Sequence, residues 1–259
     1  MKTIQDLPYA TYGEVTLHLD LHIPEGVEMP PVILWIPVGG WRGSNRDNAP
    51  SWLTEHGFAV ACNHCRVSSE AIAPATVEDC KAAVRWLRAN GVEYGLETDR
   101  IGVSGASAGG HLAALLGVSA NVPALEGDGG NAEFSSAVQA TCDVCGPTDL
   151  TRMAEAKIRL AYPTLQEVTD NFVGGPVLEH LDLARLVSPM NYVTPDVTPF
   201  LIIHGNDDLT VPIIESHIFH DALKEAGIEV ELKVIEDFGH GCPWDLFRND
   251  FVAFFKRHL

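Results

Sequence analysis

The sequence predicts an α/β protein with a mostly parallel central sheet and helices on both faces of that sheet. Two observations lead to this fold class. Apolar, strand-like segments alternate along the chain with segments of helical periodicity, which is typical of parallel sheets whose strands are joined by helices. In addition, some of the strand-like segments are apolar throughout, as strands buried on both faces are.

The individual strands are predicted from hydrophobic patterning. Residues 15–23 place valine, leucine or isoleucine at every second position, which indicates a strand with one buried face. Residues 32–36 are continuously apolar, as expected for a strand covered on both sides. Further strands are predicted at residues 58–62, 101–104, 137–144, 200–203 and 230–235.

The helices are predicted from apolar residues that recur every three or four positions. In the first helical segment, Thr76 and Asp79 have the spacing of a capping box. Apolar residues then follow on one helical face until Gly91, which is placed to end the helix. The other helical segments lie at residues 111–116, 214–223 and 246–255.

The whole chain, residues 1–259, is predicted to form a single α/β domain. Its length suits one large domain, and the sequence contains no internal repeat, low-complexity tract or long linker. Residues 151–196 interrupt the strand–helix alternation with helix-like pieces, two prolines and a Gly-Gly pair. Because this stretch lies between two predicted strands, we interpret it as a small cap-like insertion that covers a site.

The composition excludes several classes of partner. The formal net charge is −18 and the pI is near 4.8; a field of this sign repels phosphate backbones, which excludes nucleic acid. No apolar run reaches the roughly 18 residues of a membrane span, so no membrane partner is expected. The first residues show no signal segment, which predicts a cytoplasmic protein as the sequence stands, although a matured secreted form has the same appearance. No pattern predicts the oligomeric state.

The cysteines include two CxxC pairs, Cys62 with Cys65 and Cys142 with Cys145. Both pairs fall in or at the end of strand-like runs, where residues three positions apart are separated by roughly 10 Å, too far for a disulfide. Zinc knuckles place CxxC in tight turns instead, so we expect no metal at these pairs. Buried free thiols are the expected state.

The strongest functional signal is the segment Gly105-Ala106-Ser107-Ala108-Gly109, which follows a predicted strand and precedes a predicted helix. This is the GxSxG pattern in the strand–turn–helix context of a nucleophilic serine. Glycines on both sides let the strand and the helix approach each other, and the helix points its positive end at the nucleophile. We therefore predict that Ser107 is a catalytic nucleophile.

A serine nucleophile requires a histidine base, and that base requires an orienting acid. In this type of fold the acid and then the histidine follow the serine along the chain. Asp208 lies in the loop after a late strand, and His240 lies between two glycines after the last predicted strand. We predict a catalytic triad of Ser107, Asp208 and His240. Asp207 and Asp149 are alternative candidates for the acid.

An oxyanion hole needs two backbone N–H groups aimed at the oxygen that becomes negative. One donor is expected to be Ala108, the residue after the nucleophile, and the other is expected in the loop after an early strand. That loop contains Gly39 and Gly40, which we predict as donors. An ordinary glycine turn is the alternative interpretation of this pair.

Together these segments resemble the α/β-hydrolase superfamily. Within it, the sequence is similar to the bacterial esterase and lipase group related to hormone-sensitive lipase and to small feruloyl-type carboxylesterases. The resemblance implies the α/β-hydrolase fold with the triad and the oxyanion hole named above. It is carried by Val38-Gly39-Gly40-Trp41, residues 77–87, Gly105-Ala106-Ser107-Ala108-Gly109-Gly110-His111-Leu112, Gly146-Pro147-Thr148-Asp149-Leu150, His204-Gly205 with Asp208 and Val211-Pro212, and Gly239-His240.

One motif departs from the pattern of this group. The oxyanion motif of the group reads His-Gly-Gly-x-Trp, whereas here Pro37 and Val38 stand in place of the histidine and the first glycine. The resemblance implies that Gly39 and Gly40 supply the amides and that Trp41 takes part in substrate binding. The histidine usually braces this loop, so its loss is expected to affect the rigidity of the loop and the rate but not the class of reaction.

The sequence thus predicts a serine carboxylesterase that hydrolyses small or aryl carboxylic esters, feruloyl and acetyl-sugar esters among them, through an acyl-enzyme. The expected partner is a small-molecule ester, and no metal or organic cofactor is expected. An amidase or formamidase is one alternative, because the same triad can act on amides. A non-catalytic binding module is another. A long-chain lipase is disfavoured because residues 151–196 contain few apolar clusters.

Overall fold

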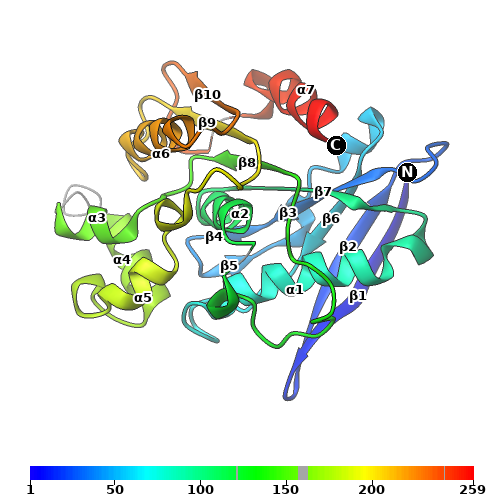
Figure 1. The fold of residues 1–259 in the computed structure, drawn as a ribbon, viewed down its shortest axis with the longest axis horizontal. Helices are drawn as coiled ribbons and strands as arrows, with labels where there is room; N and C mark the ends of the chain where they lie inside the picture. Colours follow the sequence, from blue (N-terminus) through cyan, green and yellow to red (C-terminus); the bar gives the residue numbers. More distant parts are fainter. Residues whose placement is uncertain (121, 157–162, 242) are drawn as a thin grey trace.

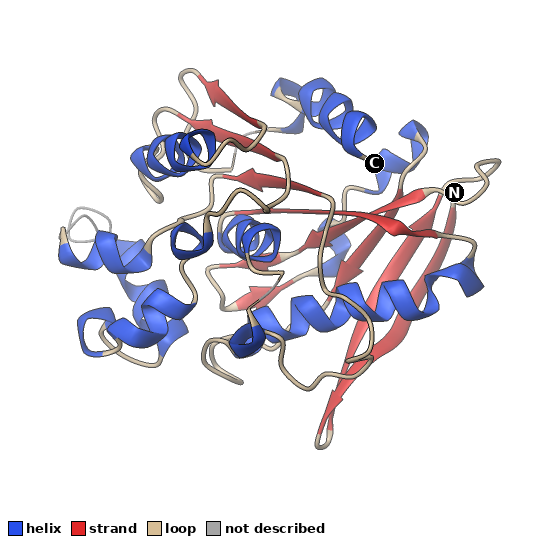
Figure 2. Ribbon diagram, viewed as in Figure 1, coloured by secondary structure: helices blue, strands red, loops and turns tan. Residues whose placement is uncertain are grey.

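The structure is a computed structural model that describes residues 1–120, 122–156, 163–241 and 243–259. Its centre is a twisted sheet with helices against both faces (Figures 1 and 2). The strands are β1 (Lys2–Tyr12), β2 (Val15–Ile23), β3 (Pro31–Ile36), β4 (Val38–Gly39), β5 (Gly43–Ser44), β6 (Ala59–Asn63), β7 (Glu97–Ala106), β8 (Ala140–Val144), β9 (Phe200–Gly205) and β10 (Val230–Ile235).

The helices include each of those that the sequence predicts, together with several short 3₁₀ turns. The α-helices are α1 (Ala75–Asn90), α2 (Ala108–Val118), α3 (Leu150–Glu155), α4 (Pro163–Val173), α5 (Leu181–Leu186), α6 (Ile214–Glu225) and α7 (Arg248–His258). The 3₁₀ helices are η1 (Arg46–Asn48), η2 (Ser51–His56), η3 (Gly91–Tyr94), η4 (Pro123–Leu125), η6 (Val177–Glu179), η7 (Pro189–Tyr192) and η8 (Trp244–Leu246).

The main sheet confirms the prediction of mostly parallel strands. Within the described ranges its order is β1-β2-β6-β3-β7-β8-β9-β10. The strands β1, β2 and β6 pair antiparallel, and all the other neighbours pair parallel. The carboxyl ends of β3, β7, β8, β9 and β10 therefore meet at one edge of the sheet, which is where ligands bind in open α/β folds.

Alternating side chains of β3 divide the interior into two hydrophobic layers. Val32 and Leu34 belong to a core with residues of α1, α2 and α6. Ile33 and Trp35 belong to a second core with residues of η2 and α7. Because both faces of the strand are covered, its uninterrupted apolar sequence is explained.

The start of α1 differs from the predicted capping box. Pro74 is the N-cap residue and makes no side-chain cap, while the Thr76 hydroxyl donates to the Arg66 carbonyl at 2.7 Å. The buried Asp79 carboxylate instead accepts hydrogen bonds from the backbone N–H and the guanidinium of Arg66. The prediction was wrong because a buried carboxylate needs a cationic partner more than the helix needs a cap.

The chain between β8 and β9 carries α3, α4, η6, α5 and η7. Figure 1 shows α3, α4 and α5 grouped together beside the sheet rather than stacked along it. The predicted insertion at 151–196 includes residues 157–162, which lie outside the described residues. Within the parts that the structure describes, no helix is long and apolar enough to span a membrane.

Candidate active site

The turn that carries Ser107 joins the end of β7 to the start of α2. Ser107 has φ 58° and ψ −121°, a backbone conformation that non-glycine residues rarely adopt and that is typical of strained functional turns. A Cβ atom on Gly105 would lie 2.5 Å from Gly109, and one on Gly109 would lie 2.3 Å from the carbonyl oxygen of Ile36. The two glycines thus permit the sharp turn that exposes the serine.

The side chains of Ser107, His240 and Asp208 form one hydrogen-bonded chain across three loops. His240 Nε2 lies 2.8 Å from Ser107 Oγ, and His240 Nδ1 lies 2.7 Å from Asp208 Oδ2. Ser107 follows β7, Asp208 follows β9 and His240 follows β10. The parallel strands therefore bring together three residues that are far apart in the sequence, and they are the three that the sequence predicts as a triad.

The Asp208 carboxylate is held by further hydrogen bonds. Its Oδ1 accepts from the backbone N–H of Thr210 at 2.7 Å and of Val211 at 2.8 Å, and Oδ2 lies 3.2 Å from Nε2 of the buried His204. Burial alone would raise the pKa of Asp208, but the hydrogen bonds from the two histidines and the backbone outweigh it and hold the pKa well below its usual range. Asp208 is therefore ionised at neutral pH.

The ionised Asp208 sets the state of His240. Burial alone would lower the pKa of His240, but the hydrogen bond to Asp208 and the neighbouring Cys145 outweigh it and raise the pKa above its usual value. Because the carboxylate can only accept, Nδ1 must carry the proton of the neutral ring. Nε2 is then the acceptor that faces the Ser107 hydroxyl, as general-base chemistry requires.

The two alternative candidates for the acid, Asp207 and Asp149, make other contacts. Asp207 is exposed, and its backbone N–H donates to the Phe238 carbonyl at 2.9 Å. Asp149 is the N-cap of α3, where its side chain accepts from the Arg152 N–H at 2.8 Å. Of the three candidate acids, Asp208 is the one whose carboxylate is hydrogen-bonded to His240.

The predicted oxyanion donors come from two segments, the start of α2 and the loop after β3. Ala108 is the first residue of α2, where the backbone N–H has no partner within the helix. Gly39 ends β4, and Gly40 follows it with φ 55°. Together with Ser107 they line one pocket. Their role as oxyanion donors stays a prediction.

Trp41 braces the oxyanion loop in the absence of the motif histidine. Its indole Nε1–H donates to His111 Nδ1 at 3.2 Å, and its ring stacks on Phe172 with a 4.7 Å centroid separation. His111 Nε2–H in turn donates to the Val187 carbonyl at 2.7 Å. Burial lowers the pKa of His111 to about 4 despite this hydrogen bond, so the ring is neutral and can accept from the indole.

These contacts hold the loop in which Pro37 stands in place of the motif histidine. Trp41 is 1% exposed and links the loop to α2, the helix that begins behind Ser107. The loop is also tied by backbone bonds from Arg42 N–H to the Gly39 carbonyl at 3.0 Å and from Asn45 N–H to the Pro37 carbonyl at 3.1 Å. The role of Trp41 in substrate binding stays a prediction, although the residue does line the pocket.

We expect Trp41→Phe to weaken this brace while the ring stacking persists. The substitution leaves His111 Nδ1 buried without its donor, which costs about 1–3 kcal/mol of unfolding free energy. A looser loop should lower kcat for ester hydrolysis by roughly tenfold, less than the loss of an oxyanion donor itself.

Thermal unfolding and steady-state kinetics check this, with Trp52→Phe as the control, because Trp52 packs in the opposite core layer. An unchanged kcat in Trp41→Phe would show that the indole hydrogen bond does not hold the loop.

The pocket in front of Ser107 has a volume of about 350 Å³. One wall is formed by α4, through Thr164, Leu165 and Val168. The α4 helix approaches the oxyanion loop closely, since a Cβ atom on Gly40 would lie 3.2 Å from Val168 Cγ1. Such a site suits a small, partly apolar group attached to a reacting carbonyl.

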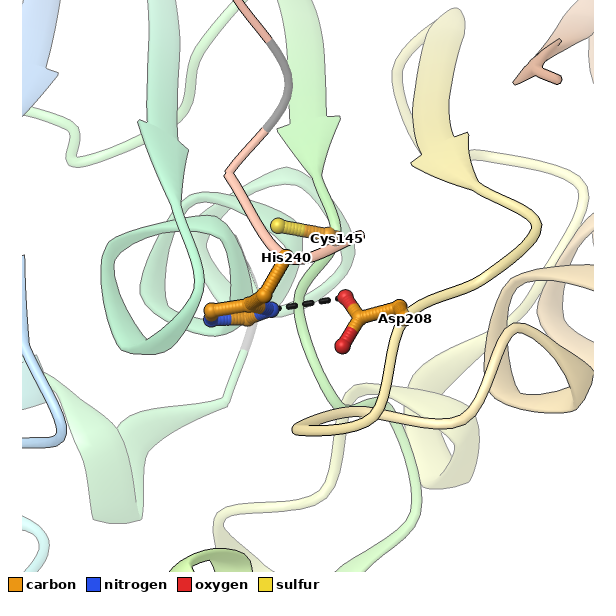
Figure 3. A group of neighbouring side chains, drawn as sticks. All are labelled: Cys145, Asp208 and His240. Carbon is orange, nitrogen blue, oxygen red and sulfur yellow. Dashed lines mark hydrogen bonds and ion pairs between the residues drawn. The ribbon is translucent and has the colours of Figure 1, made fainter. Parts of the chain in front are cut away.

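Cys145 lies beside His240 and Asp208, although the sequence does not predict it as a site residue. Its thiol sulfur, a ring nitrogen of His240 and a carboxylate oxygen of Asp208 all lie within 4.8 Å of one another, and Figure 3 shows the sulfur above the imidazole. The five cysteines in the described residues are all buried and free, which confirms the expected thiol state for them; Cys242 lies outside those residues.

The fold and the strand–turn–helix at Ser107 are those of an α/β hydrolase. The BD-FAE family model matches residues 19–223, and the chain belongs to this family. The resemblance to the esterase group of α/β hydrolases is thereby confirmed.

The chain is similar to proteins named as esterases. It is 34% identical over 232 residues to esterase LipQ of Mycobacterium tuberculosis, which covers 86% of this chain and 53% of that protein. It superposes with a TM-score of 0.86 and 28% identity on a truncated carbohydrate esterase from gut microbiota, covering 100% of this chain and 96% of the other. For a bifunctional GH43-CE protein of Bacteroides eggerthii the TM-score is 0.84 and the identity 30%, with 99% and 38% covered. The chain spans about half the length of the curated relatives it matches.

Proposed function

We propose that this protein is a serine carboxylesterase that hydrolyses small carboxylic esters through an acyl-enzyme. The observation that carries the proposal is the hydrogen-bonded chain from Ser107 through His240 to the ionised Asp208. Ser107 and His240 of this hydrogen-bonded series line a pocket large enough for a small ester. The names of the similar proteins, esterases and carbohydrate esterases, support the same class of reaction.

In the proposed mechanism, Ser107 Oγ attacks the ester carbonyl while His240 Nε2 takes its proton. Asp208 keeps the proton of the neutral ring on Nδ1 and stabilises the imidazolium that forms. His240 then protonates the leaving alcohol, so the ester C–O bond breaks and an acyl-Ser107 ester remains. A water molecule, deprotonated by His240, repeats the attack and releases the carboxylic acid.

The backbone amides of Ala108, Gly39 and Gly40 are proposed to hold the negative oxygen of each tetrahedral intermediate. Such preorganised donors act at the transition state because the charge develops only there. The Trp41 brace supports this assignment, since it joins the loop of Gly39 and Gly40 to the helix of Ala108.

We propose that the segment between β8 and β9 is a cap within a single domain. Three side chains of α4 line the pocket, and Glu167 of α4 pairs with Arg42 of the oxyanion loop at 2.7 Å. The segment therefore contacts the site rather than forming a body of its own.

We propose short acyl groups as the substrates, with acetylated sugars as the class to assay first. Leu165 and Val168 line the pocket and are proposed to limit the length of the acyl chain, and the similarity to a carbohydrate esterase favours a sugar as the alcohol. Feruloyl esters are the comparison substrate, since their acyl group is larger and aromatic.

The test is a series of p-nitrophenyl esters from acetate to octanoate, with the matched p-nitroanilide. We expect kcat/KM to be highest for acetate to butyrate and the anilide to react far more slowly. Val168→Ala should raise the octanoate-to-acetate ratio of kcat/KM by roughly tenfold, as expected when a pocket gains the space of one or two methylenes.

Leu178→Ala is the matched control, because Leu178 is an exposed leucine outside the pocket. Faster hydrolysis of the anilide than of the ester would show that the protein is an amidase and not an esterase. If Val168→Ala leaves the acyl preference unchanged, α4 does not contribute to the part of the pocket that binds the acyl group.

A further inference from the structure

The thiol of Cys145 has no part in the proposed hydrolysis, yet it lies directly beside the base. Cys145 is the first residue after β8, is fully buried and has φ 49°. Its backbone N–H donates to the Ile203 carbonyl of β9 at 2.8 Å. The sheet therefore fixes this residue where its side chain meets His240 and Asp208 (Figure 3).

These three side chains supply the donor set of a thiophilic divalent cation. Zn²⁺ is bound by cysteine sulfur at about 2.3 Å and by histidine nitrogen or carboxylate oxygen at about 2.0–2.2 Å. A tetrahedral site with these bond lengths separates its ligand atoms by roughly 3.3–3.6 Å. In the structure the sulfur, a ring nitrogen and a carboxylate oxygen of these residues lie within 4.8 Å of one another, and Nδ1 and Oδ2 are 2.7 Å apart.

The rearrangement that a metal needs is therefore small. The two atoms of the His240–Asp208 hydrogen bond must move apart by less than about 1 Å, and the sulfur, which lies within 4.8 Å of its partners, must move inward by at most about 1.5 Å. His240 can make this movement because its side chain is 25% exposed and lies on a loop, whereas that of Asp208 is fully buried. The pocket in front of His240 can supply a water as the fourth ligand.

We propose that Cys145 Sγ, His240 Nδ1 and Asp208 Oδ2 form a binding site for Zn²⁺ or Cd²⁺, and that occupation of the site inhibits the enzyme reversibly. The inhibitory part rests on the proposed function. On binding, the Cys145 S–H proton leaves to solvent, the proton of the neutral His240 ring is transferred from Nδ1 to Nε2 through solvent, and metal–ligand bonds form at Sγ, Nδ1 and Oδ2.

Inhibition follows from the tautomer of His240. When the metal occupies Nδ1, the single N–H proton of the neutral ring must sit on Nε2. Nε2 then donates towards Ser107 Oγ instead of accepting from it, so it cannot take the serine proton. The site therefore stops the reaction without covering Ser107.

Direct binding is measured with Cd²⁺ on the Ser107→Ala variant, where no esterase activity is needed. The ultraviolet charge-transfer band of a cadmium–thiolate bond reports occupation of the site. We expect the additional substitution Cys145→Ala to remove the part of the band that belongs to this site and to weaken binding by at least about tenfold.

Inhibition is measured separately with Zn²⁺ on the protein with Ser107 intact, each variant being compared with its own metal-free rate. Cys145→Ala and Cys145→Ser should each raise the half-inhibitory concentration of Zn²⁺ by at least about tenfold, and a chelator should restore the activity of the original protein. Cys142→Ala is the matched control from the same CxxC pair, and Cys242→Ala tests the cysteine nearest to His240 in the sequence.

Equal Zn²⁺ sensitivity of the original protein and Cys145→Ala would overturn the proposal, as would a Cd²⁺ band that does not depend on Cys145. The Cd²⁺ binding and Zn²⁺ inhibition measurements distinguish failure of the metal site from failure of the esterase assignment. If the esterase assignment fails, Cd²⁺ binding to Ser107→Ala still depends on Cys145, whereas failure of the metal site leaves ester hydrolysis intact.

Discussion

Replacing Ser107 by alanine is expected to lower kcat for p-nitrophenyl acetate by about 10⁴–10⁶-fold, the range seen when a triad residue is removed from a serine hydrolase. The reason is that the acyl-enzyme can no longer form, while the oxyanion donors and the pocket remain. KM should change little, since the pocket is lined mostly by other residues. The measurement is a steady-state assay with enough protein to detect the residual rate.

Ser104→Ala provides the matched control for this substitution. Ser104 is a fully buried serine on β7, the strand that leads to Ser107. Its loss should leave kcat within a few-fold of the original. A fluorophosphonate label should attach to the peptide that contains Ser107 and not to any peptide of Ser107→Ala; a label elsewhere, or equal activity in both proteins, would show that another residue is the nucleophile.

Replacing Asp208 by asparagine is expected to lower kcat by about 10⁴-fold, because the amide favours the wrong tautomer of the histidine. The substitution should also change the pH profile. His240 must be neutral to take the Ser107 proton, so kcat/KM rises with pH through the pKa of His240. In the original protein that pKa lies above the usual value of 6.5, with the bond to Asp208 among the causes that raise it.

Without the carboxylate, the cationic form of His240 loses its main stabilisation, and the rising limb of the profile should move to lower pH. Asp207→Asn is the control, because Asp207 precedes Asp208 in the chain but is exposed and makes no bond to His240. A large loss of activity in Asp207→Asn, or a limb that stays in place in Asp208→Asn, would contradict the assignment of the acid.

Most of the sheet was predictable from the sequence because its strands are covered. β3 and the first four residues of β9, Phe200 to Ile203, are apolar as a result of burial on both faces. β1 escaped prediction because it lies at the edge of the sheet, is largely exposed and shifts its register twice against β2. A strand with few buried positions leaves no regular hydrophobic pattern to detect.

The three residues predicted as a triad were selected by chain order and turn context, since the fold fixes which loops meet, and the structure places their side chains in hydrogen-bond contact. The side chains that surround these three residues were not predicted. Cys145 reaches His240 because parallel strands bring β8 and the loop after β10 to one edge of the sheet, a contact that no local motif records. The Trp41–His111 bond likewise joins residues 70 positions apart.

The separation of α4 from the strands that hold Ser107, Asp208 and His240 has an evolutionary consequence. The proposed reacting groups follow β7, β9 and β10, whereas one wall of the pocket belongs to the segment between β8 and β9. Insertions, deletions and substitutions in that segment can reshape the wall without disturbing the hydrogen bonds among the three side chains. Descendants of one ancestral scaffold can therefore diverge in the esters they accept while inheriting the same bond-breaking chemistry.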